Sequence, residues 1–213
     1  MKELIARRAA SLIQPGWVVN LGIGIPTLVS RHLDLDSVFL HTENGLLGVG
    51  PPPAPGQADP DLVDAGKQPI TRRPGAAFFD SAASFAMIRG GHVDAALLGA
   101  LQVDGQGRIA NWAVPGEPVL GVGGAMDLIT GVRTVIVLMT HTTRTGEPKI
   151  VPTCSLPLTA LRPADWIVTE LATFRVERDG LALVELAPGV SPEVVRSRTG
   201  APYHEGTTVA GGG

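Results

Sequence analysis

The chain has 213 residues, of which 44% are hydrophobic and 17% are charged, and its formal net charge is -3. This length suits one domain with a core of its own, and the low charged fraction favours a protein that buries part of its surface against another subunit. Because the net charge is negative and no cluster of Lys and Arg alternates with aromatic residues, we expect no nucleic-acid partner.

The cysteine content and the N-terminal pattern bear on the compartment. Cys154 is the single cysteine of the sequence, so no internal disulfide can form. The N-terminal segment breaks at Pro15-Gly16 before a signal-like or membrane-spanning apolar run develops. We therefore expect a cytoplasmic protein that does not bind membranes.

The first part of the chain predicts a β-loop-α-β unit. Apolar residues at helical spacing predict an amphipathic helix over 2–14. Residues 17–21 (WVVNL) predict a strand that runs into the glycine turn GIGIP. A short helix then begins at Pro26 and continues to about Leu33, and 37–42 (SVFLHT) predict the next strand.

The rest of the chain continues this alternation. Residues 51–68, rich in proline and glycine, predict a long ordered loop. Further helices are predicted at 80–91, 123–131 and 191–200, strands within 93–103 and at 133–141 and 165–170, and a hairpin around Asp179-Gly180. The pattern predicts an α/β fold with an open, mostly parallel sheet covered by helices. We expect one domain over 1–202 and a flexible C-terminal tail over 203–213.

Several short motifs argue against common kinds of site. In GIGIP, Thr27 stands where a dinucleotide fingerprint needs its third glycine. Gly22 and Gly24 either only turn the chain or also let backbone amides approach a ligand, and both interpretations stay open. The histidines have no metal-ligand spacing and no GxSxG occurs, so we expect neither a metal site nor a serine hydrolase.

Glu43 lies one residue past the strand predicted over 37–42, where open α/β sheets bind their ligands. Asn44 and Gly45 follow it, and both residue types tolerate left-handed backbone. A solvated turn carboxylate is the commoner role for such an acid. The alternative is a nucleophile that attacks a thioester, with exposed amides of NLGIG or GVGGAM as donors to the oxyanion.

The order of motifs resembles one enzyme family over nearly the whole chain, to about Pro202. The segments are NLGIGIPTLVS, HTENGLLGVGPPP, DAGKQ, FFDSAASFAMIRGGHVD, ANWAVPG and GVGGAMDL. Together they resemble the B (β) subunit of the family I 3-oxoacid CoA-transferases, whose ENG loop and GGAMDL signatures match without gaps. The resemblance implies the open α/β fold shared with ribose-5-phosphate isomerase-like proteins.

By this resemblance Glu43 is the catalytic glutamate, which forms an acyl anhydride and then a glutamyl-CoA thioester in ping-pong kinetics. To attack, it must be ionised, so we expect its pKa to stay below the operating pH, helped by neighbouring amide donors. Asn20 is similar to the family's active-site asparagine, and Gly124 or its neighbour Gly123 resembles the backbone position that contacts the thioester or its oxyanion. The residues expected to shape the loops of the site are Gly22, Gly24, Asn44 and Gly45.

The resemblance also implies a partner and substrates. An A (α) subunit, in an A2B2 heterotetramer, is expected to complete the active site, with no permanently bound cofactor and a coenzyme A thioester as substrate. Succinyl-CoA is the expected donor. HTENG, PAPG and RTGEPKIVP favour 3-oxoadipate over acetoacetate as acceptor, because the acetoacetate subgroup tends to carry QSENG. Candidate cations for a dicarboxylic acceptor are Arg72, Arg73, Arg144 and Lys149.

Two other interpretations remain at this stage. A metabolite-sensing domain of the same fold would bind a ligand without chemistry and would tolerate Gln at Glu43. Alternatively, the chain would only support catalysis by a partner, although the intact ENG loop argues against this. Loss of turnover in a folded Glu43→Gln variant discriminates the transferase from both.

Overall fold

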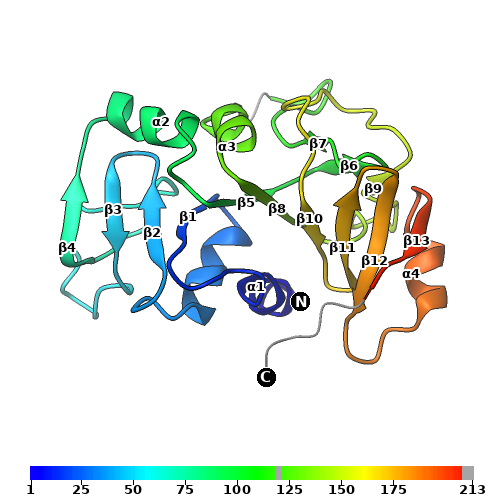
Figure 1. The fold of residues 1–213 in the computed structure, drawn as a ribbon, viewed down its shortest axis with the longest axis horizontal. Coiled ribbons are helices and arrows are strands. Elements are labelled where there is room, and N and C mark those ends of the chain that lie inside the picture. Colours follow the sequence, from blue (N-terminus) through cyan, green and yellow to red (C-terminus); the bar gives the residue numbers. More distant parts are fainter. Residues whose placement is uncertain (119–120, 208–213) are drawn as a thin grey trace.

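The computed structural model describes residues 1–118 and 121–207, which form a ten-stranded sheet with helices on both faces and a small three-stranded sheet at one side (Figure 1). The large sheet has the order β13-β12-β11-β10-β8-β5-β1-β2-β3-β4. Its five central strands are parallel, and antiparallel strands extend it at either side. The predicted open, mostly parallel α/β sheet is therefore confirmed.

The strands of the large sheet are β1 (Val18–Leu21), β2 (Phe39–Thr42), β3 (Leu46–Val49), β4 (Arg72–Phe78), β5 (Ala95–Gly99), β8 (Thr134–Leu138), β10 (Trp166–Val168), β11 (Ala172–Glu177), β12 (Gly180–Leu186) and β13 (Tyr203–Glu205). The small sheet contains β6 (Gln102–Asp104), β7 (Ile109–Ala110) and β9 (Ile150–Val151). The helices are α1 (Lys2–Ala10), η1 (Pro26–His32), α2 (Ser81–Arg89), α3 (Ala125–Gly131) and α4 (Pro192–Arg198).

The central strand β8 is apolar on both faces because helices cover both faces of the sheet. Along β8, Val135 and Val137 belong to one core cluster, whereas Ile136 and Leu138 belong to the other. Successive side chains of a strand point to opposite faces, so a continuous apolar run fits a strand buried on both sides. Figure 1 shows α2 and α3 along one face of the sheet and α1 with η1 along the other.

Local signals explain several element boundaries. The Asp80 carboxylate accepts a hydrogen bond of 2.8 Å from the Ala83 amide and so caps the N-terminus of α2. The hairpin predicted around Asp179-Gly180 is formed by β11 and β12. The final helix begins with Pro192 at its first position, where the missing N–H costs no hydrogen bond.

The first helix is shorter than the predicted 2–14 and ends at Ala10. The Leu12 and Ile13 amides bond to carbonyls three residues back, and the Ser11 hydroxyl bonds to the Arg8 carbonyl. These contacts tighten the last turn and end the helix. The segment from Pro26 to His32 is likewise a tighter 3₁₀ helix rather than an α-helix.

The strand predicted over 37–42 is present as β2, but the sequence reasoning missed the two strands that extend the sheet beyond it. Strand β3 pairs antiparallel with β2, and β4 pairs antiparallel with β3. Gly48 has φ 91°, and its backbone approaches Ala76 so closely that a Cβ would lie 3.1 Å from that residue. The pairing shifts register between Leu47 and Val49, so the glycine marks an irregularity within a strand rather than a loop.

The C-terminal segment also differs in part from the predicted tail over 203–213. Strand β13 pairs in parallel with β12, and the Gly206 amide donates to the Leu183 carbonyl at 2.8 Å. Residues 203–206 are therefore held at an edge of the large sheet. The remainder of the predicted tail, 208–213, lies outside the described residues.

We predict that Gly45→Ala lowers the free energy of unfolding by at least about 3 kcal/mol, through backbone strain and steric overlap. Gly45 has φ 121°, and an added Cβ would lie well inside 3.0 Å of the Phe79 carbonyl oxygen. Gly56 is the matched control, since it has φ 78° with nothing within 4 Å of the added atom. Chemical denaturation that shows equal losses for Gly45→Ala and Gly56→Ala would contradict this prediction.

Candidate active site

Three neighbouring parallel strands bring the candidate residues to one edge of the sheet. Asn20 of β1 lies opposite His41 of β2, and the Gly22 amide donates to the Leu97 carbonyl of β5 at 2.8 Å. The carboxyl ends of these strands therefore meet at the same edge. Strand β2, the next strand in the sequence, pairs with one side of β1, whereas the later strand β5 pairs with the other side. In open α/β sheets, ligands bind in the crevice where the strand order reverses in this way.

Glu43 occupies the tight turn between β2 and β3 and is half-buried. The Gly45 amide closes the turn on the Thr42 carbonyl at 3.0 Å. The Asn44 side chain donates from Nδ2 to the Val63 carbonyl at 2.9 Å, which ties the turn to the long loop. Asn44 thus anchors the turn through its side chain, while Gly45 provides the positive φ.

Gly124, at the start of α3, lies directly against the Glu43 carboxylate. A Cβ on Gly124 would lie 3.0 Å from Oε2, 3.1 Å from Cδ and 3.2 Å from Oε1 of Glu43. Gly123 has φ 52°, is exposed, and has nothing within 4 Å of an added Cβ. The two adjacent glycines therefore differ in placement: Gly124 contacts the acid and Gly123 turns the chain into α3.

Two opposing effects act on the ionisation of Glu43. Burial raises the pKa of its carboxyl above the ordinary value of 4.5, and a hydrogen bond with the Gly124 backbone lowers it. Burial is the larger effect, so the net direction of the pKa is upward. Ionising this group in the folded protein costs more than ionising a solvated glutamate.

Asn20 belongs to a buried chain of polar side chains beneath this edge. It is 2% exposed, and its Nδ2 lies 3.2 Å from His41 Nδ1. His41 Nε2 in turn lies 3.2 Å from the hydroxyl of Ser84 in α2, and the imidazole stacks on Phe79. Burial lowers the pKa of His41 to about 4, so the ring is neutral at neutral pH.

Sequence reasoning missed His41 and Ser84 as parts of the site. The available signal was a histidine inside an otherwise apolar strand, which must find hydrogen-bond partners when it is buried. Two further buried atoms near Glu43, Asn20 Oδ1 and Thr42 Oγ1, have no hydrogen-bond partner among the described residues. Such atoms are uncommon in folded proteins, and a catalytic role or a bound water or ion is among the explanations for them.

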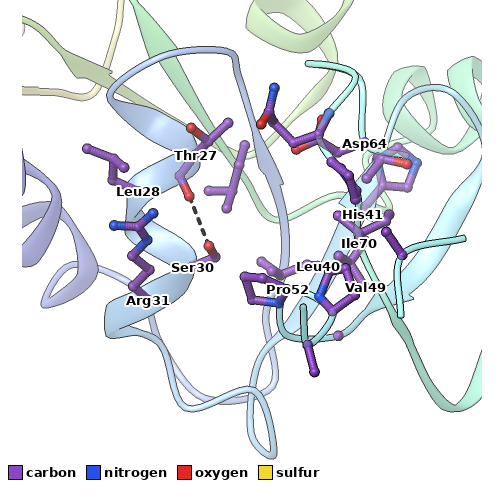
Figure 2. A pocket seen from close by; sticks show the side chains of 18 of the residues that line it. Thr27, Leu28, Ser30, Arg31, Leu40, His41, Val49, Pro52, Asp64 and Ile70 are labelled. Atoms are coloured by element: carbon purple, nitrogen blue, oxygen red, sulfur yellow. Dashed lines mark hydrogen bonds between the residues drawn. The ribbon is translucent and has the colours of Figure 1, made fainter. Parts of the chain in front are cut away.

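A cavity of about 580 Å³ lies between η1 and the strands β2 and β3, closed from the side by the long loop. Figure 2 shows Thr27, Leu28 and Ser30 on one wall and Leu40, His41, Val49 and Ile70 on the other. Thr42 also lines it, so the cavity begins one residue from Glu43. Gly24, with φ 96°, turns the chain from β1 into η1 and so positions the first wall.

The four cations proposed for a dicarboxylic acceptor differ in their surroundings. Arg73 forms an ion pair of 2.5 Å with Asp36. Lys149 donates from Nζ to the Ala100 carbonyl at 2.8 Å, and burial lowers its pKa. Arg72 and Arg144 are exposed.

One group of potential metal ligands lies away from the turn that carries Glu43, although the histidine spacing predicted none. Ligand atoms of Glu177, Asp179 and His204 lie within 4.8 Å of one another. Arg175 forms an ion pair with Glu177 and offsets part of its charge.

Within residues 1–118 and 121–207, the helices are all too short or too polar to cross a bilayer.

We predict that Glu43→Gln raises the thermal unfolding temperature at neutral pH. Because burial raises the pKa of Glu43, the stability linked to its protonation is full below about pH 4.5 and is lost as the pH rises through the folded-state pKa. Glutamine does not titrate, so the difference between variant and wild type should shrink on acidification. Glu147→Gln, at an exposed carboxylate, is the control. Equal unfolding temperatures for Glu43→Gln and wild type at neutral pH would contradict the prediction.

Comparisons with known proteins agree with this architecture. The model of the coenzyme A transferase family matches residues 2–198. The β subunit of the 3-oxoadipate CoA-transferase of Pseudomonas putida is 51% identical over 93% of this chain and 93% of its own length. The β subunit of the succinyl-CoA:3-ketoacid coenzyme A transferase of Helicobacter pylori is 47% identical over 95% of this chain and 98% of its own.

A solved structure of a CoA transferase has a similar fold. An acyl-CoA transferase from Escherichia coli O157:H7, in a thioester complex with CoA, superposes with a TM-score of 0.70 and 25% identity over 95% of this chain. This chain spans 41% of that protein's length. With a family model over almost its full length and relatives near 50% identity, the chain belongs to the coenzyme A transferase family, as a β subunit.

Proposed function

We propose that this chain carries the nucleophile of a CoA-transferase that moves CoA from succinyl-CoA to a 3-oxo acid, and that the nucleophile is Glu43. The observation that carries the proposal is the approach of the Glu43 carboxylate to Gly124 at the carboxyl edge of the parallel strands. Packing by itself does not explain why a half-buried carboxylate is held against a backbone amide. The arrangement fits a carboxylate whose reaction creates an oxyanion.

The chemistry proceeds without net oxidation or reduction. A Glu43 oxygen attacks the succinyl thioester carbonyl, the C–S bond breaks, and CoA leaves as thiolate from a mixed anhydride of Glu43 and succinate. The thiolate then attacks the Glu43 carbonyl, which releases succinate and leaves a glutamyl-CoA thioester. The acceptor carboxylate then attacks this thioester and expels CoA thiolate, which leaves a second anhydride between Glu43 and the acceptor. The thiolate attacks the acceptor carbonyl of that anhydride, which forms the acceptor-CoA thioester and releases the Glu43 carboxylate.

Each tetrahedral step places negative charge on a former carbonyl oxygen. The Gly124 backbone, which lies directly against the carboxylate, is the first candidate donor to that charge. Asn20 is the second candidate donor, since its side chain carries an amide N–H₂ group and is buried at the same edge. The missing Cβ at Gly124 lets the carboxylate approach the amide, and Gly22, Gly24, Asn44 and Gly45 position the surrounding loops.

The acceptor is proposed to be 3-oxoadipate. The relative from Pseudomonas putida is named for that substrate, and this chain carries His41 in HTENG. Acetoacetate is the second candidate, because the Helicobacter pylori relative is named for 3-ketoacids. The ratio of kcat/KM for the two acceptors decides between them.

An A (α) subunit is proposed as the partner, since the matched relatives are named as one of two kinds of subunit. By the family resemblance we further propose an A2B2 assembly in the cytoplasm, with the active site at the boundary between the α and β subunits. The coenzyme A thioester is a substrate, and no permanently bound cofactor takes part.

We predict that the complex with its α subunit, treated with succinyl-CoA and then borohydride, loses mass at Glu43. Borohydride reduces a glutamyl thioester to the alcohol and releases CoA, so peptide mass spectrometry locates the modified residue. Glu43→Gln should show no modification and should lose nearly all turnover while remaining assembled. An unmodified Glu43 in an assembled wild-type complex that binds succinyl-CoA would remove the nucleophile assignment.

We predict that Gly124→Ala lowers kcat by roughly 10²-fold, since small displacements of a reacting group cost about this much. The new methyl would lie 3.0 Å from Glu43 Oε2 and would push the carboxylate away from the amide. Gly123→Ala is the matched control, because its methyl meets open space, although its positive φ costs some stability. Steady-state kinetics that find equal losses of kcat for the two variants would contradict the role of Gly124.

A further inference from the structure

The buried chain formed by Asn20, His41 and Ser84 leaves one polar atom of Asn20 without a partner among the described residues. His41 is 2% exposed and Ser84 is 0% exposed, so bulk water does not satisfy these groups. The three side chains come from β1, β2 and α2, and the contacts of 3.2 Å on both sides of the imidazole connect them. Which atom of Asn20 stays unpaired depends on the proton of His41.

The Asn20 amide can adopt two orientations in the same space, because rotation by 180° exchanges Oδ1 and Nδ2. In one, Nδ2 donates to His41 Nδ1, and Oδ1 is left unpaired. In the other, His41 Nδ1–H donates to Oδ1, and Nδ2 is left unpaired. The neutral imidazole carries its proton on Nε2 in the first arrangement and on Nδ1 in the second.

The Ser84 hydroxyl distinguishes the two arrangements. Among the described residues, His41 Nε2 is the one hydrogen-bond partner of Ser84 Oγ. If Nε2 carries the proton, it donates to Ser84, and the hydroxyl hydrogen has no acceptor, in addition to the unpaired Asn20 Oδ1. If Nδ1 carries the proton, the hydroxyl donates to Nε2, and only the Asn20 NH₂ group is unpaired. Each buried group left without its bond is destabilising, so the second arrangement, which leaves fewer of them, is favoured.

We propose that His41 is a positioning residue that holds Asn20 by its Oδ1, with the imidazole proton on Nδ1, and so keeps Asn20 Nδ2 free as a donor at the carboxyl edge beside Glu43. This inference rests on the proposed function, since it concerns the oxyanion of that reaction. A free N–H₂ group stabilises developing negative charge, whereas a free carbonyl oxygen repels it. His41 touches neither reacting atom and acts through Asn20.

The surroundings of His41 keep this arrangement fixed. Phe79 stacks on the ring at 5.7 Å between centroids with an angle of 13°, and α2 holds Ser84 in a regular helix. In the register of the sheet, Asn20 lies opposite His41, and Glu43 follows two residues later on the same strand and turn. The amide donor, its orienting imidazole and the nucleophile thus sit on two adjacent strands.

The test is the tautomer of His41 in the assembled complex, in which only this chain carries ¹⁵N-histidine. Magic-angle-spinning NMR separates protonated from unprotonated ring nitrogens, and the His41→Gln variant assigns the signal by its loss. A proton on Nδ1 is expected. A proton on Nε2 would overturn the proposal, and this readout does not depend on whether Glu43 is the nucleophile.

Kinetics provide the second arm. His41→Phe keeps an aromatic ring against Phe79 but cannot hold Asn20, so kcat should fall by about 10- to 100-fold with KM little changed, approaching the loss for one oxyanion donor. His41→Gln retains an amide N–H that can donate to Asn20 Oδ1 and should recover most of the lost kcat. Asn20→Asp, which can accept from His41 but cannot donate, should lose about 10²-fold or more.

The outcomes separate the two proposals. A folded, assembled His41→Phe variant with the kcat of the wild type would overturn the positioning role while leaving Glu43 in place. Failure of the borohydride modification at Glu43 would instead overturn the proposed function, and the tautomer would still be measured. A proton on Nδ1, loss of kcat in His41→Phe and recovery in His41→Gln together support the inference.

Discussion

The contact between the Glu43 carboxylate and Gly124 is the constraint on which the site depends. It requires a residue without Cβ at the start of α3, because any side chain there would lie within about 3 Å of the acid. It also requires the β2–β3 turn to reach across to that helix, and Gly45 allows this by taking φ 121° against Phe79. Gly45 and Gly124 lie far apart in the sequence, and both are needed for this contact.

Beneath this contact, polar groups occupy places where an α/β core normally holds apolar side chains. Asn20, His41, Thr42 and Ser84 are all buried, and two of their atoms lack a partner among the described residues. Unpaired buried atoms lower stability, as does a carboxyl whose pKa is raised by burial. Stability is therefore given up around Glu43, which is typical of a site arranged for chemistry rather than for packing.

Much of the fold could be predicted from local patterns, and the exceptions have identifiable causes. The apolar run of β8, the Asp80 cap and the hairpin at Asp179-Gly180 are encoded within a few residues. Strand β4 could not be recognised, since Pro74 and Gly75 stand inside it and an edge position tolerates both. Strand β13 was missed because it is stabilised by pairing with β12, and the helix α4 separates the two strands along the chain.

The sequence by itself determined the class of sheet, the ENG turn at its carboxyl edge and the family resemblance, because they follow from local residue patterns and short motifs and from the order of these along the chain. Only the tertiary structure decided which of two adjacent glycines meets the acid, and that His41 links Asn20 to Ser84. Those contacts join β1, β2, α2 and α3 across the fold. Their distances follow from strand register and helix packing, which act between segments far apart along the chain and leave no local signature.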